Sequence, residues 1–397
     1  MPIGYRIKRN NILSVFTLAT CLLAACASAT ETQAPPTAVP LPQEALPTET
    51  QITLPAWTAQ LSAAINAAPI VSGELVIAAT ADGAVHATRG QSGESAWVYA
   101  PASKVWDASV NADAGRVCGG MEGKQVFCLD ARTGQPLWTT AVSQEVQSRV
   151  ALDGERVFAP TTWAGSGMVT DFNGRASLFA LDAASGEIIW EAATDNYILR
   201  RPSVSGETVL VGGAYQVDGQ PAGTIATRIY AFSVADGSAL WKYESDDGLL
   251  RWVEADDKVA AFSAATETVY ALDLKDGKLL WERGPGYWMQ FPAMQDGKIF
   301  FGSGDEIFQA LDALSGQKIW QQSIEMSSLN QIGRPFIRGE RVWFNAVTGE
   351  IYALDLATGE IIQHLKTGHS SRVGGALFGD FYILGDPDGN LYAYAIQ

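Results

Sequence analysis

The chain has 397 residues, of which 47% are hydrophobic and 10% aromatic, and its formal net charge is −16 at pH 7. Because DNA and RNA are polyanions, this charge disfavours a nucleic-acid ligand, and the sequence has no basic stripe with interleaved aromatic residues to offset it. The acidic balance fits a protein that works outside the cytoplasm.

Residues 1–25 have the pattern of a bacterial lipoprotein signal peptide. Three basic residues precede an apolar run from Ile12 to Ala25, which is too short for a spanning helix in the mature protein. The run ends in Leu23-Ala-Ala-Cys26, which looks like a lipobox. Cleavage before Cys26 and lipidation of its thiol would tether the protein to a membrane surface, and the net charge would change from −16 to −19 because three basic side chains are lost. An ordinary cleaved signal peptide is the alternative.

Residues 26–51 are expected to be a disordered tether. They hold five prolines and many Thr, Ala and Glu residues, a composition that cannot bury a core. As a flexible chain this segment would span roughly 25–30 Å. No later segment is apolar enough to cross a bilayer.

Residues 52–397 contain eight copies of a unit of roughly 40 residues, a period typical of propeller blades. A clear copy is Phe179-Ala-Leu-Asp-Ala-Ala-Ser-Gly-Glu-Ile-Ile-Trp190: an apolar strand with a small central residue, a turn that ends in Gly, and a Trp. Each copy reads as four short strands joined by Gly-containing turns. The pattern predicts an all-β fold, an eight-bladed β-propeller of four-stranded antiparallel blades. The small residues are Ala87, Cys128, Ala180, Ala231, Ala271, Ala310, Ala353 and Ala393.

The two ends of this region predict how the ring closes. The last copy, Leu391 to Gln397, stops before its Gly and Trp half, and a matching half, Leu54-Pro-Ala-Trp57, stands at the start with no strand before it. We therefore expect the N-terminal strand to become the outermost strand of the last blade, which would hide both unpaired edges.

Seven of the copies carry Trp on the fourth strand, and the seventh copy has Gln363 instead. We interpret these rings as structural covers over the gaps between neighbouring blades, each burying on the order of 200 Å². The residues are Trp57, Trp97, Trp138, Trp190, Trp241, Trp281 and Trp320.

Two cysteines, Cys118 and Cys128, fall in the second copy. A three-residue loop centred on Gly123 would place them directly opposite each other, so that a disulfide could form outside the cytoplasm; a two-residue turn would put them on different faces and leave two free thiols. No His lies at ligand spacing to either cysteine, so no metal site is predicted. The three His residues fit no nucleophile motif, and no catalytic residue is assigned.

Arginine recurs where the first strand of several blades begins. Aligning the copies places Arg149, Arg201, Arg251 and Arg334 at one position in blades 3, 4, 5 and 7, so that they would converge at one end of the central channel. Guanidinium groups suit carboxylate or phosphate ligands. The candidate binding face consists of Arg149, Arg200, Arg201, Arg251, Arg334, Trp252, Trp288, Asp246 and Asp247. The alternative is that the arginines pair with nearby acids such as Asp246, Asp247 and Glu254.

The repeated motif resembles the pyrroloquinoline-quinone (PQQ) propeller repeat, Ala-x-Asp-x-x-Thr-Gly-x-x-x-Trp, over essentially all of residues 52–397. Within that family the sequence is most similar to BamB-type lipoproteins, which use an eight-bladed ring as a binding platform in outer-membrane barrel assembly. In these proteins a Leu-x-Leu-Arg segment and acidic loop residues contribute to the partner surface, and the nearest matches here are Leu199-Arg200 and Asp246-Asp247. The PQQ dehydrogenases carry an adjacent Cys-Cys pair that this chain lacks, so neither PQQ nor another cofactor is expected.

The resemblance implies a non-enzymatic, lipid-anchored scaffold for protein–protein interaction, with a candidate role in outer-membrane β-barrel assembly. We expect a monomeric ring in the cell envelope that binds a periplasmic or extracellular protein, either at the outer membrane facing the periplasm or on the outer face of the cytoplasmic membrane. The lipid anchor would be its contact with the membrane. The alternative is a small-molecule or glycan binder, or a PQQ-dependent dehydrogenase, that uses the channel mouth.

Overall fold

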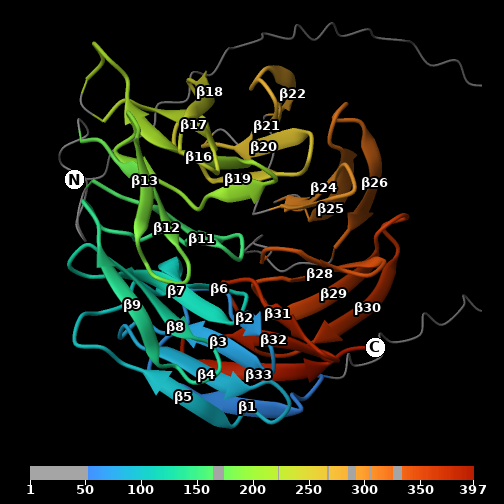
Figure 1. Ribbon diagram of the computed structural model, residues 1–397. Coiled ribbons are helices and arrows are strands. Elements are labelled where there is room, and N and C mark those ends of the chain that lie inside the picture. The colour runs from blue at the N-terminus through green and yellow to red at the C-terminus, as the bar shows by residue number, and fades with distance from the viewer. Residues whose placement is uncertain are drawn as a thin grey trace, which may run out of the picture. The chain divides into compact units, whose positions relative to one another are not determined.

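The computed structural model describes residues 52–163, 174–221, 223–265, 268–284, 292–303, 306–324 and 333–397. Eight antiparallel β-sheets follow one another around a ring, and we number these blades 1 to 8 (Figure 1). The prediction of an all-β, eight-bladed propeller is confirmed. Residues 1–51, with the predicted signal peptide, Cys26 and tether, lie outside the described residues. In the described part, no helix has the length and apolar character needed to cross a membrane.

In blades 1 to 7 the strands run outward from the channel in chain order. Blade 1 contains β2 (Ile70–Ser72), β3 (Leu75–Ala79), β4 (Val85–Arg89) and β5 (Ser95–Tyr99). After the 3₁₀ turn η1 (Asp107–Ser109), blade 2 contains β6 (Asn111–Asp113), β7 (Arg116–Met121), β8 (Gln125–Asp130) and β9 (Pro136–Ala141). Blade 3 contains β10 (Ala151–Leu152), β11 (Arg156–Pro160), β12 (Ser177–Asp182) and β13 (Ile188–Ala193). Blade 4 contains β14 (Ile198–Leu199), β15 (Ser203–Ser205), β16 (Thr208–Gln216), β17 (Ile225–Ser233) and β18 (Ala239–Ser245).

The second half of the ring repeats this order. Blade 5 contains β19 (Trp252–Ala255), β20 (Val259–Ser263), β21 (Val269–Asp273) and β22 (Leu279–Arg283). Blade 6 contains β23 (Ala293–Gln295), β24 (Lys298–Ser303), β25 (Ile307–Asp312) and β26 (Lys318–Ser323). Blade 7 contains β27 (Phe336–Arg338), β28 (Arg341–Asn345), β29 (Glu350–Asp355) and β30 (Ile361–Lys366). Blade 8 contains β31 (Ala376–Phe378), β32 (Phe381–Gly385) and β33 (Asn390–Ala395), completed by β1 (Trp57–Gln60).

The ring closes as the sequence predicts. The order of blade 8 is β1-β33-β32-β31, so the N-terminal strand forms its outer edge, and Figure 1 shows blue β1 beside red β33. The pairing is antiparallel with Trp57 opposite Ala393, the same register as between the small residue and the Trp in blades 1 to 6. Because β1 pairs with β33, it covers the outer edge of the C-terminal strand and gives blade 8 four strands.

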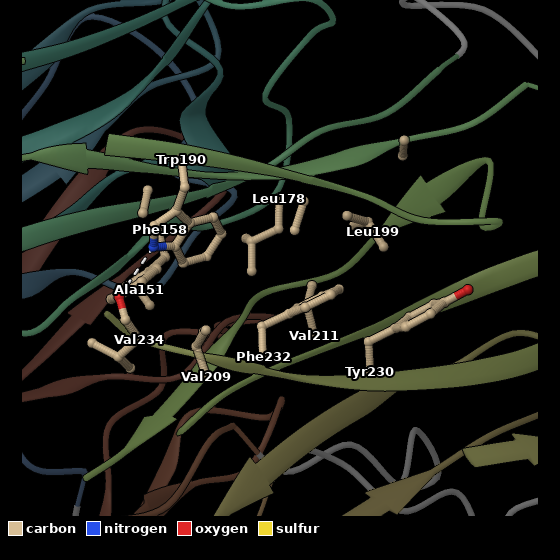
Figure 2. Packing of buried hydrophobic residues seen from close by; sticks show 13 residues of the cluster. Ala151, Phe158, Leu178, Trp190, Leu199, Val209, Val211, Tyr230, Phe232 and Val234 are labelled. Carbon is tan, nitrogen blue, oxygen red and sulfur yellow. Dashed lines mark hydrogen bonds between the residues drawn. The ribbon is translucent and has the colours of Figure 1, made fainter. Parts of the chain in front are cut away.

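The Trp residues of the fourth strands join each blade to the next. In each of the seven contacts the indole Nε1 donates a hydrogen bond to a backbone carbonyl of the following blade, 2.8–3.2 Å away. The indole ring also lies against the glycine that ends the neighbouring turn, where an added Cβ would come within 2.4–2.7 Å of the ring. Figure 2 shows one contact, in which Trp190 of blade 3 bonds to the carbonyl of Val234 in blade 4 above the Phe158 and Phe232 rings.

The structure gives a physical reason for Gln363 in blade 7. A Trp at that position would need a glycine turn between the third and fourth strands of blade 8, but the fourth strand there is β1, which no turn connects to the third strand, β33. Gln363 instead accepts a hydrogen bond from the backbone N–H of Gln397 at 3.0 Å. The exception in the repeat therefore lies next to the blade in which the ring closes.

Cys118 on β7 and Cys128 on β8 are opposite each other and joined in a disulfide. Met121 pairs with Gln125, so the connecting loop consists of three residues with Gly123 at its centre, and this length sets the register. Both cysteines are fully buried between blades 2 and 3. The bridge adds a covalent link to a hairpin that the sheet already aligns.

Candidate functional site

The arginines that the sequence aligns are gathered around one cavity at the end of the channel. This channel-mouth cavity has a volume of about 330 Å³ and is lined by residues at or near the start of the inner strands of seven blades. Its charged lining residues are Arg149, Arg200, Arg201, Arg251, Arg334, Arg372 and Glu254. Inner strands lie closest to the ring axis, so their first residues meet although they are far apart in sequence.

Glu254 on β19 is held by two arginines from other blades. Its Oε1 lies 3.0 Å from Nη1 of Arg201 in blade 4 and 2.8 Å from Nη2 of Arg334 in blade 7, and its side chain is 13% exposed. Burial raises the pKa of Glu254 above its ordinary value, and the charge of Arg201 opposes this rise. For these two arginines, the alternative of pairing with a nearby acid therefore holds, with Glu254 as the acid.

Arg149 and Arg200 have a different environment. Nη2 of Arg149 donates to the backbone carbonyl of Ala68 at 3.0 Å, across the mouth in blade 1. Burial, with a smaller contribution from the charge of Arg201, lowers the pKa of Arg149 to about 10, and burial also lowers the pKa of Arg200. Among the described residues neither guanidinium has a carboxylate within ion-pair distance, and Nε of Arg200 is buried without a hydrogen-bond partner. Both groups remain cationic at neutral pH.

The aromatic and acidic members of the candidate face fall in different places. Trp252 lines the cavity but is only 3% exposed, so it supports the wall more than it offers a contact surface. Asp246 is exposed and Asp247 is buried near the hydroxyl of Tyr270, and neither lines the cavity. Trp288 lies outside the described residues. The carboxylate of the cavity comes from Glu254, which the sequence offered only as a pairing partner.

Arg372 and Gln147 line the cavity and were not identified from the sequence. Arg372 lies shortly before Ala376, where the first strand of blade 8 begins, and Gln147 precedes the aligned Arg149 by two residues. A wider window around the aligned position would have included both. Within the described part of the chain, no group of three His, Cys, Asp or Glu side chains is arranged as a metal site.

Beside the mouth, blade 4 carries a long hairpin formed by β16 and β17, nine residues each. Its strands pair from Thr208 opposite Ser233 out to Gln216 opposite Ile225. Arg228 lies 3.7 Å over the ring of Tyr215 and pairs with Glu244 of β18 at 2.9 Å.

Comparison with known proteins finds one matching family and several similar sequences. The chain matches the family described as "Outer membrane protein assembly factor BamB" over residues 54–112, 100–173, 126–282 and 225–397. It is 24% identical to the Escherichia coli protein of that name over 372 residues, which cover 78% of this chain and 91% of that protein. It is 31% identical to the Burkholderia pseudomallei protein over 193 residues, 47% of this chain and 46% of that relative.

Solved structures and a more distant relative agree on the fold. The crystal structure of BamB from Moraxella catarrhalis has a TM-score of 0.60 at 18% identity and covers 86% of this chain and 98% of that one. Quinohemoprotein alcohol dehydrogenase from Comamonas testosteroni is 30% identical over 156 residues, 34% of this chain and 22% of that protein. The family match over residues 54–397, together with the eight-bladed ring, shows that the chain belongs to the BamB outer membrane protein assembly factor family.

Proposed function

We propose that this protein is a non-enzymatic scaffold of the cell envelope that binds a protein partner during the assembly of outer-membrane β-barrel proteins. The observation that carries the proposal is the match to the BamB family along nearly the whole ring. A ring with Trp contacts at seven blade junctions offers a surface whose parts keep fixed positions, which favours binding without a large loss of conformational entropy.

The partner surface that we favour is the face of the channel mouth. Arginine is enriched at protein interfaces, and here six arginines line one cavity in an otherwise acidic protein. The hairpin of β16 and β17 belongs to the same face and adds further charged groups. An acidic segment of a partner protein would complement this surface.

Substitution of Arg201 and Arg251 by Ala tests this face. Capture of the host's barrel-assembly proteins by chemical crosslinking in envelope preparations should fall at least fivefold in the double variant, because two cations are removed from the mouth. Arg132→Ala is the matched control, since Arg132 lies in an exposed turn at the opposite end of blade 2. Far-UV circular dichroism should show that all three proteins are folded. Unchanged capture by the double variant would place the partner surface elsewhere, and absence of any barrel-assembly protein from the wild-type crosslinks would contradict the assembly role.

We further propose that lipid on Cys26 anchors the ring, with residues 26–51 as the tether. The lipobox-like sequence before Cys26 supports this step. Cys26→Ser should move the protein from the membrane fraction to the soluble fraction and abolish incorporation of labelled fatty acid. Membrane association that survives the substitution would require another anchor.

The redox alternative has its own measurement. The partial similarity to a quinohemoprotein alcohol dehydrogenase makes PQQ with calcium the relevant addition. Under the scaffold proposal, these additions produce no alcohol-dependent reduction of an artificial electron acceptor. Turnover that requires both PQQ and alcohol would overturn the non-enzymatic assignment.

A further inference from the structure

The channel-mouth cavity has a large excess of positive charge. Six arginines and a single carboxylate, that of Glu254, are its charged lining residues among those that the structure describes, which leaves an excess of five positive charges. The whole chain has a formal charge of −16, so this local excess is opposite in sign to the protein around it. Like charges held close together in a partly desolvated site repel one another unless an anion compensates them.

The compensation available from the protein reaches only part of the cluster. Arg201 and Arg334 share the carboxylate of Glu254, whereas Arg149 has a neutral carbonyl as its described partner and Arg200 has no described carboxylate. Burial lowers the pKa of both Arg149 and Arg200, which shows that their surroundings disfavour the charged form. Next to them, Nε2 of Gln147 is buried without a hydrogen-bond partner among the described residues. The side of the mouth formed by blades 3 and 4 therefore has cationic and neutral hydrogen-bond donors that no described carboxylate engages.

The size and form of the cavity limit what could use these donors. A volume of about 330 Å³ is at the lower end of small-molecule pockets, which run from roughly 300 to 1,000 Å³. Guanidinium groups bind carboxylate and phosphate oxygens in a planar, bidentate manner. Several guanidiniums arranged around one small cavity suit an anion with more than one such group, since each group can engage a different arginine.

We propose that the channel-mouth cavity binds a compact, multivalent oxyanion that carries two or more carboxylate or phosphate groups, held on one side by Arg149, Arg200 and Gln147. The acidic exterior repels long polyanions, while the field of the arginines attracts a small anion into the mouth. Because these three residues come from blades 3 and 4, the bound anion adds a link between two blades that the Trp190 contact already joins. Its binding therefore stabilises the folded ring.

Isothermal titration calorimetry on the purified protein tests the proposal with four probes: citrate, succinate, pyrophosphate and inorganic phosphate, each at constant ionic strength set by sodium chloride. We expect saturable binding of citrate or pyrophosphate with a stoichiometry of one, and weaker binding of succinate and phosphate because they have fewer charges. A preference for citrate would identify carboxylate as the recognised group, and a preference for pyrophosphate would identify phosphate. If none of the four binds above the chloride background, the proposal is wrong.

Two variants assign the binding to these residues. Arg149→Gln and Arg200→Gln should each weaken binding at least tenfold, whereas Arg132→Gln on the opposite end of blade 2 should leave it unchanged. If a Gln variant fails to fold, Arg149→Lys keeps the charge but removes the planar fork, and it should also weaken binding. Equal affinity in all these proteins would overturn the site. The measurement needs no partner protein, so its outcome is independent of whether crosslinking supports the assembly role.

Discussion

The contact between Trp190 of blade 3 and Gly237 of blade 4 should behave as a single energetic unit. The Trp190 ring is 8% exposed, and its Nε1 donates to the carbonyl of Val234 at 3.1 Å (Figure 2). A Cβ added at Gly237 would lie 2.7 Å from two atoms of this ring, and the φ of Gly237 is +70°, which L side chains rarely adopt. An alanine at Gly237 would therefore meet two separate obstacles, and only one of them depends on the Trp190 ring.

The expected free energies follow from these two terms. Trp190→Ala should lower the free energy of unfolding by about 3–5 kcal/mol, the usual cost of removing a buried aromatic ring. Gly237→Ala should cost about 1 kcal/mol for the positive φ, as an alanine in this conformation usually does. Overlap with the ring should add about 1–3 kcal/mol. In the double variant the overlap is gone, so the total loss should be smaller than the sum of the single losses by about 1–3 kcal/mol.

Equilibrium unfolding in urea, followed by far-UV circular dichroism, measures the three variants. Gly206→Ala is a matched control, because Gly206 has a φ of +55° and a Cβ there would meet no atom within 4 Å, so this variant reports the backbone term alone. Gln363→Ala tests the same strand position without an indole and should cost less than about 1 kcal/mol. If Gly237→Ala costs no more than Gly206→Ala, or if the losses at Trp190 and Gly237 add, the reasoning about the blade contact is refuted.

Further predictions concern the disulfide, a buried histidine and a buried amide. Replacing both Cys118 and Cys128 by Ala should lower the free energy of unfolding by up to about 2.7 kcal/mol, which is the loop-closure entropy for a separation of 10 residues. An unchanged free energy of unfolding in urea would contradict this prediction. Burial lowers the pKa of His86 below 6.5, so the unfolded chain binds the proton more readily than the folded protein. The stability of the fold should therefore fall as the pH decreases from roughly 7 to 5. In thermal melts, His86→Gln should remove this contribution to the decrease of the melting temperature with pH. An identical slope in both proteins would argue against it. Asn345 is fully buried, and its Oδ1 accepts a hydrogen bond from the Tyr382 hydroxyl at 3.0 Å. Asn345→Leu should therefore lower the free energy of unfolding by about 2–3 kcal/mol, and Tyr382→Phe should lower it by about 1 kcal/mol. A larger loss for Tyr382→Phe than for Asn345→Leu in urea unfolding would contradict this reasoning.

The sequence was sufficient for the architecture because a propeller repeats its contacts. The small residue, the Gly turn and the Trp recur from unit to unit, so each copy of the sequence predicts the strands of its blade and the contact with the next blade. The unmatched halves at the two ends gave the ring closure, which the pairing of Trp57 with Ala393 confirms. Even the aligned arginines were found in this way, since equivalent positions in equivalent blades must lie around the same axis.

What lies across the channel was decided only by the tertiary structure. Arg334 of blade 7 reaches Glu254 of blade 5, and Arg149 of blade 3 reaches the carbonyl of Ala68 in blade 1. Both contacts depend on distances between blades that are not neighbours. The repeat contains no signal for these contacts, because each side chain reaches over a gap whose width is set by how all eight blades pack. The sequence by itself determined the ring and the residues that face its axis; the folded ring determined which of those charges neutralise one another and which do not.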